Sequence, residues 1–243
     1  MHLLVTRPEP DSLKLVGLLQ KRGHSAQAAP LSAFVPLGLE PDALEGVTAL
    51  IATSRNALRA LVGTDALEAA RALPIFTVGG ATAEEARRMN FMRVVKGPGT
   101  GAELVPLIAS MVDAAEDRLL HVAGQRLAYD LAGELAHLGV RVETRTVYRM
   151  QHATALPRDV VQTINSGLLD GVILMSPDAA TIWTRLVVRH GLERAVRGVA
   201  HLCLSDAVAR RLSPLPGIDV ERAAGPTLEE MLALVDLAAA NRG

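Results

Sequence analysis

Small polar residues follow the short apolar runs of this sequence, and they are the residues best placed to do chemistry. Eight such turns occur, at residues 6–8, 53–56, 79–82, 97–101, 124–126, 176–178, 205–206 and 225–227. Hydroxyl groups and the free N–H groups at helix N-termini donate hydrogen bonds to anions. Taken together, the turns suit a large ligand with several separated carboxylates. Taken alone, each turn is better explained as an ordinary helix cap.

Tyr148 is the candidate for proton transfer. It stands near the end of a β-like segment, residues 142–149, with Arg145 and Arg149 close in sequence. A phenol carries its proton at neutral pH, so it can donate a hydrogen bond or a proton to a departing oxygen. The alternative is a tyrosine packed at a strand end with its hydroxyl satisfied, and the local sequence leaves both open.

Other kinds of site are not indicated. The run Gly97-x-Gly99-x-Gly101 lacks the G-x-G-x-x-G spacing of a dinucleotide-binding turn, and the sequence has no Gly-Lys-Ser/Thr for a phosphate loop. The seven histidines are scattered rather than spaced as zinc ligands. No serine stands in a G-x-S-x-G elbow, and Cys203 lies inside an apolar run, as a core residue does. We therefore expect no metal, no cofactor and no covalent nucleophile.

The composition excludes several classes of binding partner. The 243 residues carry 25 Lys and Arg against 26 Asp and Glu, and only 2% are aromatic, so neither a positive field nor a stacking surface for nucleic acid is expected. A single cysteine excludes an intrachain disulfide and fits a reducing compartment. No run approaches the roughly 18 apolar residues of a membrane span. We expect a cytoplasmic protein without membrane or nucleic-acid partners.

The elements that must position these residues alternate along the chain. Short apolar runs are separated by longer segments of helical period, such as Leu15, Leu18 and Leu19 before Gly23. This order predicts βαβ units and parallel sheets, in which the turns after the strands gather at one edge. The runs that predict strands are residues 3–5, 49–52, 75–78, 119–122, 171–175 and 201–204.

The chain also contains an internal repeat. Leu3 and Gly23 match Leu119 and Gly139 at an offset of 116, and later matches follow at offsets of 122 and 127. A slowly growing offset indicates duplication followed by small insertions, which gives halves of about 1–118 and 119–243. Residues 33–37 and 142–149 are interpreted as equivalent connectors between two lobes, and we expect the ligand in a crevice between those lobes.

In order and spacing, several short motifs resemble the uroporphyrinogen-III synthase family over essentially the whole chain. The segments that carry the resemblance are Val5-Thr6-Arg7-Pro8, Thr53-Ser54-x-Asn56-Ala57, residues 78–83, Gly124-x-Arg126 with Leu131, Leu135 and Gly139, Val147-Tyr148-Arg149, Ser176-Pro177 and Pro226-Thr227-Leu228.

The resemblance implies an α/β fold of two flavodoxin-like lobes, each a doubly wound parallel sheet, joined by a two-stranded antiparallel linker. One lobe would comprise residues 1–34 plus 151–243 and the other residues 37–148, with linkers at about 33–40 and 142–152. The repeat boundary near residue 118 then marks the duplication, whereas the linkers mark the physical boundary of the lobes.

The resemblance also implies an activity. Members of the family cyclise the linear tetrapyrrole hydroxymethylbilane to uroporphyrinogen III in haem biosynthesis, with loss of water and inversion of ring D. The reaction requires no cofactor. We expect a monomer that binds this small substrate and makes at most a transient contact with porphobilinogen deaminase, which supplies it.

The resemblance implies roles for particular residues. Tyr148 would assist loss of the hydroxyl group as the catalytic residue. Substrate-binding roles fall to Ser54, Thr82 and Ser176 through their hydroxyls, to Arg7 and Arg126 through carboxylate contacts, and to Gly101, Ser205 and Thr227 in their turns. Where many members have Gly-x-Thr-x-Ala, this chain has residues 204–209, Leu-Ser-Asp-Ala-Val-Ala, so Ser205 would have to replace a threonine. The alternative function is a non-catalytic cytoplasmic protein that binds or senses a carboxylated small molecule.

Overall fold

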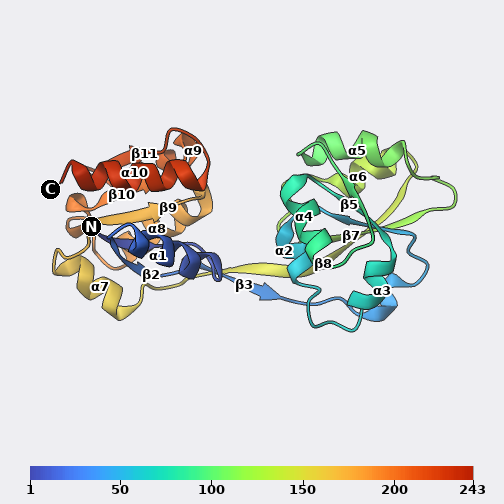
Figure 1. The fold of residues 1–243 in the computed structure, drawn as a ribbon, viewed down its shortest axis with the longest axis horizontal. Helices are drawn as coiled ribbons and strands as arrows, with labels where there is room; N and C mark the ends of the chain where they lie inside the picture. Colours follow the sequence, from blue (N-terminus) through green and yellow to red (C-terminus); the bar gives the residue numbers. More distant parts are fainter. Residues whose placement is uncertain (243) are drawn as a thin grey trace. The chain divides into compact units, whose positions relative to one another are not determined.

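The computed structural model describes residues 1–242, which form two compact units, each with its own sheet (Figure 1). Unit 1 consists of Met1–Ala33 and the chain from Gln151 onward, and unit 2 consists of Phe34–Met150. The chain therefore passes between the units twice, near residue 33 and near residue 150. Within residues 1–242, no helix is both long and apolar enough to cross a membrane.

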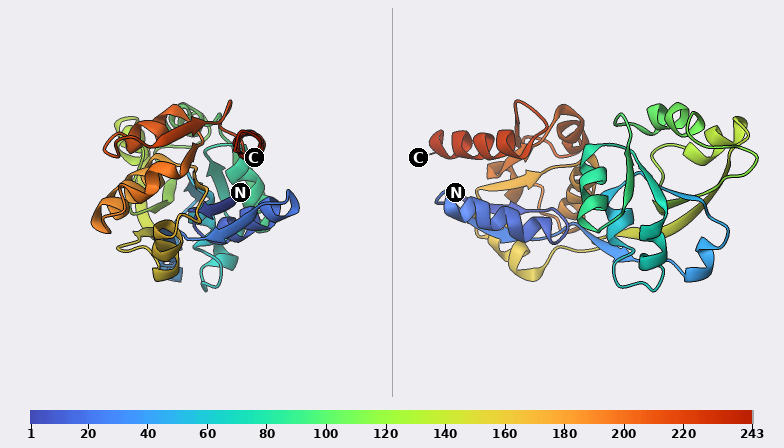
Figure 2. Two further views of the ribbon diagram at one scale, coloured as in Figure 1. Left: turned by 90° about the vertical axis from the view of Figure 1, so that its left-hand side faces the viewer. Right: turned by 45° about the vertical axis from the view of Figure 1, so that its right-hand side comes forward.

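Unit 1 has a parallel sheet with the strand order β11-β10-β9-β1-β2. Its strands are β1 (His2–Val5), β2 (Ser25–Ala28), β9 (Gly171–Leu174), β10 (Ala200–Cys203) and β11 (Asp219–Arg222). Its helices are α1 (Asp11–Lys21), α7 (Arg158–Asn165), α8 (Pro177–Arg189), α9 (Asp206–Ala209) and α10 (Leu228–Ala240), with 3-10 turns η2 (Ala195–Gly198) and η3 (Arg210–Leu212). The N-terminus and the end of α10 lie close together in every view (Figures 1 and 2).

Alternation along the strands distributes the helices of unit 1 over both faces of its sheet. Leu3 and Val5 of β1 pack against α1 and α10, whereas Leu4 packs against α7 and α8 on the opposite face. Because both faces are covered, the central strands are mostly apolar, and every residue of β9 and β10 is buried, including His201.

Unit 2 contains most of the second sheet, which has the strand order β3-β8-β7-β4-β5-β6. Its strands are β3 (Ser32–Pro36), β4 (Ala49–Ala52), β5 (Pro74–Thr77), β6 (Arg93–Lys96), β7 (Arg118–Gly124) and β8 (Arg141–His152). Helices α2 (Arg55–Arg59), α3 (Leu67–Ala72) and α4 (Gly80–Arg88) pack on one face, whereas α5 (Gly101–Ala109) and α6 (Leu131–His137) pack on the other. A 3-10 turn, η1 (Pro41–Leu44), precedes β4.

Strands β4 to β8 pair in parallel, so the predicted α/β fold with parallel sheets is confirmed. Beside them, the backbone N–H of Leu37 donates to the carbonyl of Val147 at 2.8 Å, and that of Ala153 donates to Leu31 at 2.9 Å. Residue numbers rise along one segment as they fall along the other, which is antiparallel pairing.

Each sheet combines strands from both halves of the repeat. In unit 1, β1 and β2 of the first half join β9, β10 and β11 of the second, and in unit 2, β7 and β8 join β4, β5 and β6. The equivalence drawn between residues 33–37 and 142–149 is wrong. The first part of β8, from Arg141 onward, pairs with β7 in the same way as β2, from Ser25 onward, pairs with β1. In the repeat, this part of β8 therefore corresponds to β2.

Candidate active site

A pocket of about 500 Å³ lies at the carboxyl ends of the parallel strands of unit 2. It is lined by residues that follow β4, β5, β6 and β7 and by residues of β7 and β8. These residues are Thr53, Ser54, Val78, Gly99, Thr100, Gly101, Ala102, His121, Gly124, Arg126, Leu127, Ala128, Tyr129, Leu131 and Tyr148.

The sheet topology explains why the pocket forms there. β4 and β7 are neighbours, but the chain leaves β4 for α2 on one face and leaves β7 for α6 on the other. Two adjacent turns that diverge to opposite faces leave a crevice beyond the strand ends, where ligands of open α/β sheets bind. Thr53 and Ser54 come from the first of these turns, and residues 124–129 come from the second.

Tyr148 is seated over Gly124 by an irregularity in the pairing of β7 and β8. Ala123 pairs with Thr146, but Gly124 pairs with Tyr148, so a bulge in β8 skips one residue. A Cβ on Gly124 would lie 2.6 Å from Cζ of Tyr148, which only glycine permits. The ring also lies against Phe34, with centroids 5.5 Å apart. The half-buried phenol thus has a defined seat in the pocket wall.

A second tyrosine closes another part of the pocket in the same manner. A Cβ on Gly101 would lie 2.9 Å from Cδ1 of Tyr129, so the Tyr129 ring rests on the start of α5. Thr100 caps this helix, accepting from the N–H of Glu103 at 3.2 Å and donating to its carboxylate at 2.7 Å. The chain has only two tyrosines, and both line this pocket.

His121 is a buried polar residue of the pocket that the sequence did not single out. Its side chain is on β7, and the residue is 1% exposed. Nε2 lies 3.1 Å from Oγ1 of Thr53, and Nδ1 lies 3.5 Å from Oγ1 of Thr144. Burial lowers the pKa of His121 to about 4, because the charged imidazolium is poorly solvated there, so the ring is neutral at physiological pH.

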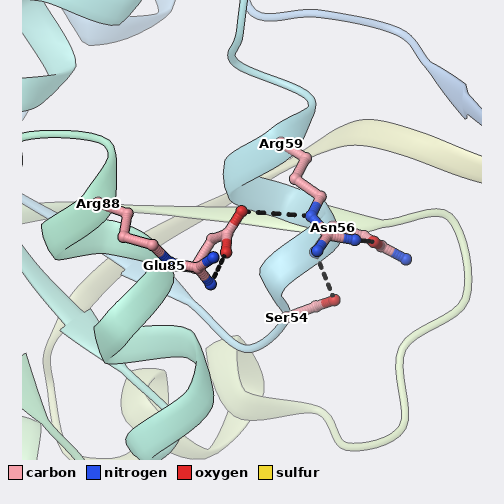
Figure 3. A network of polar contacts seen from close by, with 5 residues as sticks. All are labelled: Ser54, Asn56, Arg59, Glu85 and Arg88. Carbon is pink, nitrogen blue, oxygen red and sulfur yellow. Dashed lines mark hydrogen bonds and ion pairs between the residues drawn. The ribbon is translucent and has the colours of Figure 1, made fainter. Parts of the chain in front are cut away.

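A polar network joins α2 to α4 behind Ser54 (Figure 3). The carboxylate of Glu85, a residue only 9% exposed, accepts from Nε of Arg59 at 3.3 Å and also pairs with Arg88. Oγ of Ser54 accepts the N–H of Asn56 at 3.1 Å and so caps α2. Because a buried carboxylate needs such partners, the network fixes the two helices together and with them the position of Ser54.

The charge of the pocket lining suits an anion. Within the described chain, no Asp or Glu lines the pocket, and Arg126 is its one basic side chain. No carboxylate of residues 1–242 forms an ion pair with Arg126, which is exposed. Among the described residues, no cluster of His, Cys, Asp and Glu could hold a metal ion.

Four of the predicted residues come together in this pocket, namely Ser54, Gly101, Arg126 and Tyr148. Thr82 does not line it. It lies on α4, three residues before Glu85, and is 5% exposed. Sequence reasoning missed His121 and Tyr129. The available signal for His121 was a polar residue in the middle of an apolar run, and for Tyr129 it was the rarity of tyrosine in the chain.

The remaining predicted residues belong to unit 1, at the carboxyl ends of its strands. Arg7 pairs with Asp11 at 2.6 Å. Oγ of Ser176 accepts the N–H of Ala179, and Oγ1 of Thr227 accepts that of Glu230, so both cap helices. Ser205 precedes α9 without a capping bond from its side chain. These four residues are not part of the unit 2 pocket.

Comparison with known proteins identifies the family. The family model for uroporphyrinogen-III synthase HemD matches residues 14–233. The chain belongs to the uroporphyrinogen-III synthase family. No curated protein sequence matches it significantly.

Solved structures show the same fold at low sequence identity. The uroporphyrinogen-III synthetase of Helicobacter pylori is 19% identical, with a TM-score of 0.65, and the match covers 98% of this chain and 99% of that one. A mutant uroporphyrinogen III synthase of the extremely thermophilic bacterium Thermus thermophilus is 18% identical, with a TM-score of 0.55, and the match covers 99% of each chain. Family membership gives the chain its general function, that of a cyclising lyase in haem biosynthesis.

Proposed function

We propose that this chain cyclises hydroxymethylbilane to uroporphyrinogen III, and that the unit 2 pocket binds the end of the bilane that carries the hydroxymethyl group. The observation that carries this proposal is the Tyr148 phenol, seated on Gly124 in a pocket free of acidic side chains. A volume of about 500 Å³ lies within the range of small-molecule sites.

The substrate's carboxylates supply the binding contacts. Ser54 caps α2 with its oxygen, so its hydrogen stays free to donate to a carboxylate. The first N–H groups of α5, at Gly101 and Ala102, have no partner within the helix and lie at the positive end of its dipole. Arg126 adds a full positive charge at the exposed rim.

Tyr148 acts on the leaving hydroxyl. Its phenol transfers its proton to the departing oxygen as the C–O bond breaks, so water leaves with the electron pair of that bond, and the phenolate is reprotonated by the proton that ring D later loses. The remaining carbocation is stabilised by the pyrrole nitrogen. The substituted carbon of ring D then attacks it to form a spiro intermediate. The older bond from that carbon, to the methylene that leads to ring C, breaks, and this methylene bonds instead to the unsubstituted α-carbon of ring D, which then loses its proton.

Selection of the attacking carbon is the main task of the enzyme. The bilane loses water and closes unaided to the uninverted isomer, so the protein must hold ring D with its substituted carbon near the cation. This is catalysis by positioning, for which rigid seats such as Gly124 beneath Tyr148 are suited.

The two units correspond in this proposal to the two flavodoxin-like lobes of the family. Unit 1 has the strand order 2-1-3-4-5 when its strands are numbered along the chain, which supports this assignment. Segments β3 and β8 would be the two-stranded antiparallel linker. Arg7, Thr82, Ser176, Ser205 and Thr227 remain proposed substrate contacts, and the protein is proposed to act as a cytoplasmic monomer.

A coupled assay tests the function. Porphobilinogen and porphobilinogen deaminase generate the bilane, the products are oxidised, and the type I and type III porphyrins are resolved with and without this protein. We expect type III to predominate when the protein is added. If type I remains the sole product, the synthase assignment is wrong, and ligand binding without turnover would then favour the binding-protein alternative.

A further inference from the structure

We propose that His121 is a positioning residue of the pocket, which holds the hydroxyl of Thr53 so that its hydrogen points to a substrate carboxylate. The inference rests on the proposed function for its ligand, but its structural part, the state of the imidazole, can be measured without turnover.

His121 occupies a position where the sheet would otherwise hold an apolar residue. It lies on β7 between Ile51 of β4 and Thr144 of β8 in the strand register. Its neighbours Leu120 and Val122 are fully buried. A polar group in such a strand is costly to bury unless it is hydrogen-bonded, and its two partners here are the hydroxyls of Thr53 and Thr144.

Because the ring is neutral, its tautomer decides the direction of each hydrogen bond. A neutral imidazole has one N–H donor and one acceptor nitrogen. With the proton on Nε2, the ring donates to Oγ1 of Thr53, and the Thr53 hydrogen is free to point into the pocket. With the proton on Nδ1, Thr53 must donate to Nε2 and presents only lone pairs to the pocket, which repel carboxylates.

This role of His121 requires the Nε2–H tautomer. In that tautomer the Thr144 hydroxyl donates to Nδ1, and Nε2 donates to Thr53 over the shorter of the two contacts, 3.1 Å. Burial keeps the pKa of the ring low, at about 4, so both nitrogens do not carry protons together near neutral pH. Thr53 itself lines the pocket, beside Ser54. His121 thus makes Thr53 a second hydroxyl donor of the same turn.

His201 offers a matched control. It is equally buried, at 0% exposed, and burial also lowers its pKa to about 4. It lies on β10 of unit 1, where Nδ1 contacts the carbonyls of Val199 at 2.9 Å and Asp219 at 3.2 Å. Replacing His201 therefore disturbs a buried neutral histidine without touching the pocket.

The first experiment compares His121→Gln, His121→Asn and His121→Phe by steady-state kinetics with hydroxymethylbilane. The amide nitrogen of glutamine reaches the place of Nε2, whereas that of asparagine reaches the place of Nδ1. We expect KM to rise roughly three- to tenfold in the Asn and Phe variants with kcat nearly unchanged, and to stay near the wild-type value in the Gln variant. Equal rises in all three variants, or a rise of the same size in His201→Phe, would overturn the proposal.

A double-mutant cycle tests whether His121 acts through Thr53. Thr53→Ala removes the donor, so adding His121→Phe should cause no further rise in KM. If the two effects on KM multiply, His121 acts by another route and the proposal is wrong.

Tautomer measurement separates this inference from the proposed function. In ¹⁵N-histidine-labelled wild-type protein, long-range ¹H–¹⁵N spectra assign the protonated nitrogen, and His121→Gln identifies the resonances. We expect the proton on Nε2. A proton on Nδ1 would refute the inference even if the protein makes uroporphyrinogen III, and an Nε2 proton would support it even if the isomer assay fails.

Discussion

The ring of Tyr148 fills the space that a side chain on Gly124 would need. A methyl group on Gly124 would lie 2.6 Å from Cζ and 2.8 Å from the hydroxyl oxygen of Tyr148. The bulge that pairs these two residues directly is the reason for this closeness. The phenol proposed to act on the leaving hydroxyl is therefore positioned by the backbone at Gly124 as well as by the Phe34 ring beside it.

Gly124→Ala should displace the phenol without straining the backbone, because Gly124 is not in the left-handed region. We expect kcat to fall by roughly tenfold or more, since misplacing a reacting group by about 1 Å is costly. Gly17→Ala in α1 is the control, because a Cβ there meets nothing within 4 Å. Unchanged kcat in Gly124→Ala would mean that the seat of the ring is unimportant.

Tyr148→Phe removes only the hydroxyl and keeps the ring against Phe34. We expect kcat to fall by roughly ten- to a hundredfold, toward the low end of general acid catalysis, because the bilane also loses water unaided. The unfolding midpoint should stay close to that of the wild type. Tyr129→Phe, in the same pocket, should leave kcat nearly unchanged. If the Tyr148→Phe variant turns over normally, Tyr148 is structural.

Ser176→Ala and Ser205→Ala separate capping from substrate binding. Ser176 caps α8 through the N–H of Ala179, so we expect its loss to lower the free energy of unfolding by about 1 kcal/mol. Ser205 makes no such bond, and its loss should cost less than about 0.5 kcal/mol. Urea unfolding measures both effects. A rise in KM in Ser205→Ala at unchanged stability would indicate a substrate contact, and an equal loss of stability in the two variants would contradict the capping assignment.

The two buried histidines should make the fold sensitive to mild acid. Their pKa values are lowered from 6.5 to about 4, so below pH 6.5 the unfolded chain binds protons that the folded chain does not. The stability present above pH 6.5 is therefore lost as the pH falls toward 4, by about 2 kcal/mol per histidine at pH 5. In urea unfolding at pH 7 and pH 5, His201→Phe should lose less stability than the wild type, by about 2 kcal/mol, the contribution of one histidine. An undiminished loss in that variant would mean that His201 is not the titrating group.

The central strands could be predicted from the sequence because they are continuous apolar runs, such as Leu50 to Ala52 in β4. The edge strands β2 and β11 could not be predicted in this way. They have one strand neighbour each, remain partly exposed and carry polar residues, as in Ser-Ala-Gln-Ala and Asp-Val-Glu-Arg. Their short patterns resemble loops until the neighbouring strand is known.

The lining of the unit 2 pocket was predictable where it depends on the turns after strands. Ser54, Gly101 and Arg126 follow strands, whereas Tyr148 lies within β8, and all four line one pocket. The role of His121 was not predictable, because it depends on which residues of β4 and β8 lie beside it. Cross-strand register of this kind is set by the packing of the whole unit, not by the residues next to His121 in the chain.

The most direct measurement of whether the substrate occupies the unit 2 pocket uses the chain's two tyrosines and its single tryptophan. Protein labelled with 3-fluorotyrosine gives two ¹⁹F resonances, which Tyr129→Phe and Tyr148→Phe assign, and 5-fluorotryptophan reports Trp183, which is buried in unit 1. On titration with uroporphyrinogen III kept reduced, both tyrosine resonances should shift saturably, and by more than that of Trp183. A saturable shift of Trp183 with both tyrosine resonances unmoved would contradict the account.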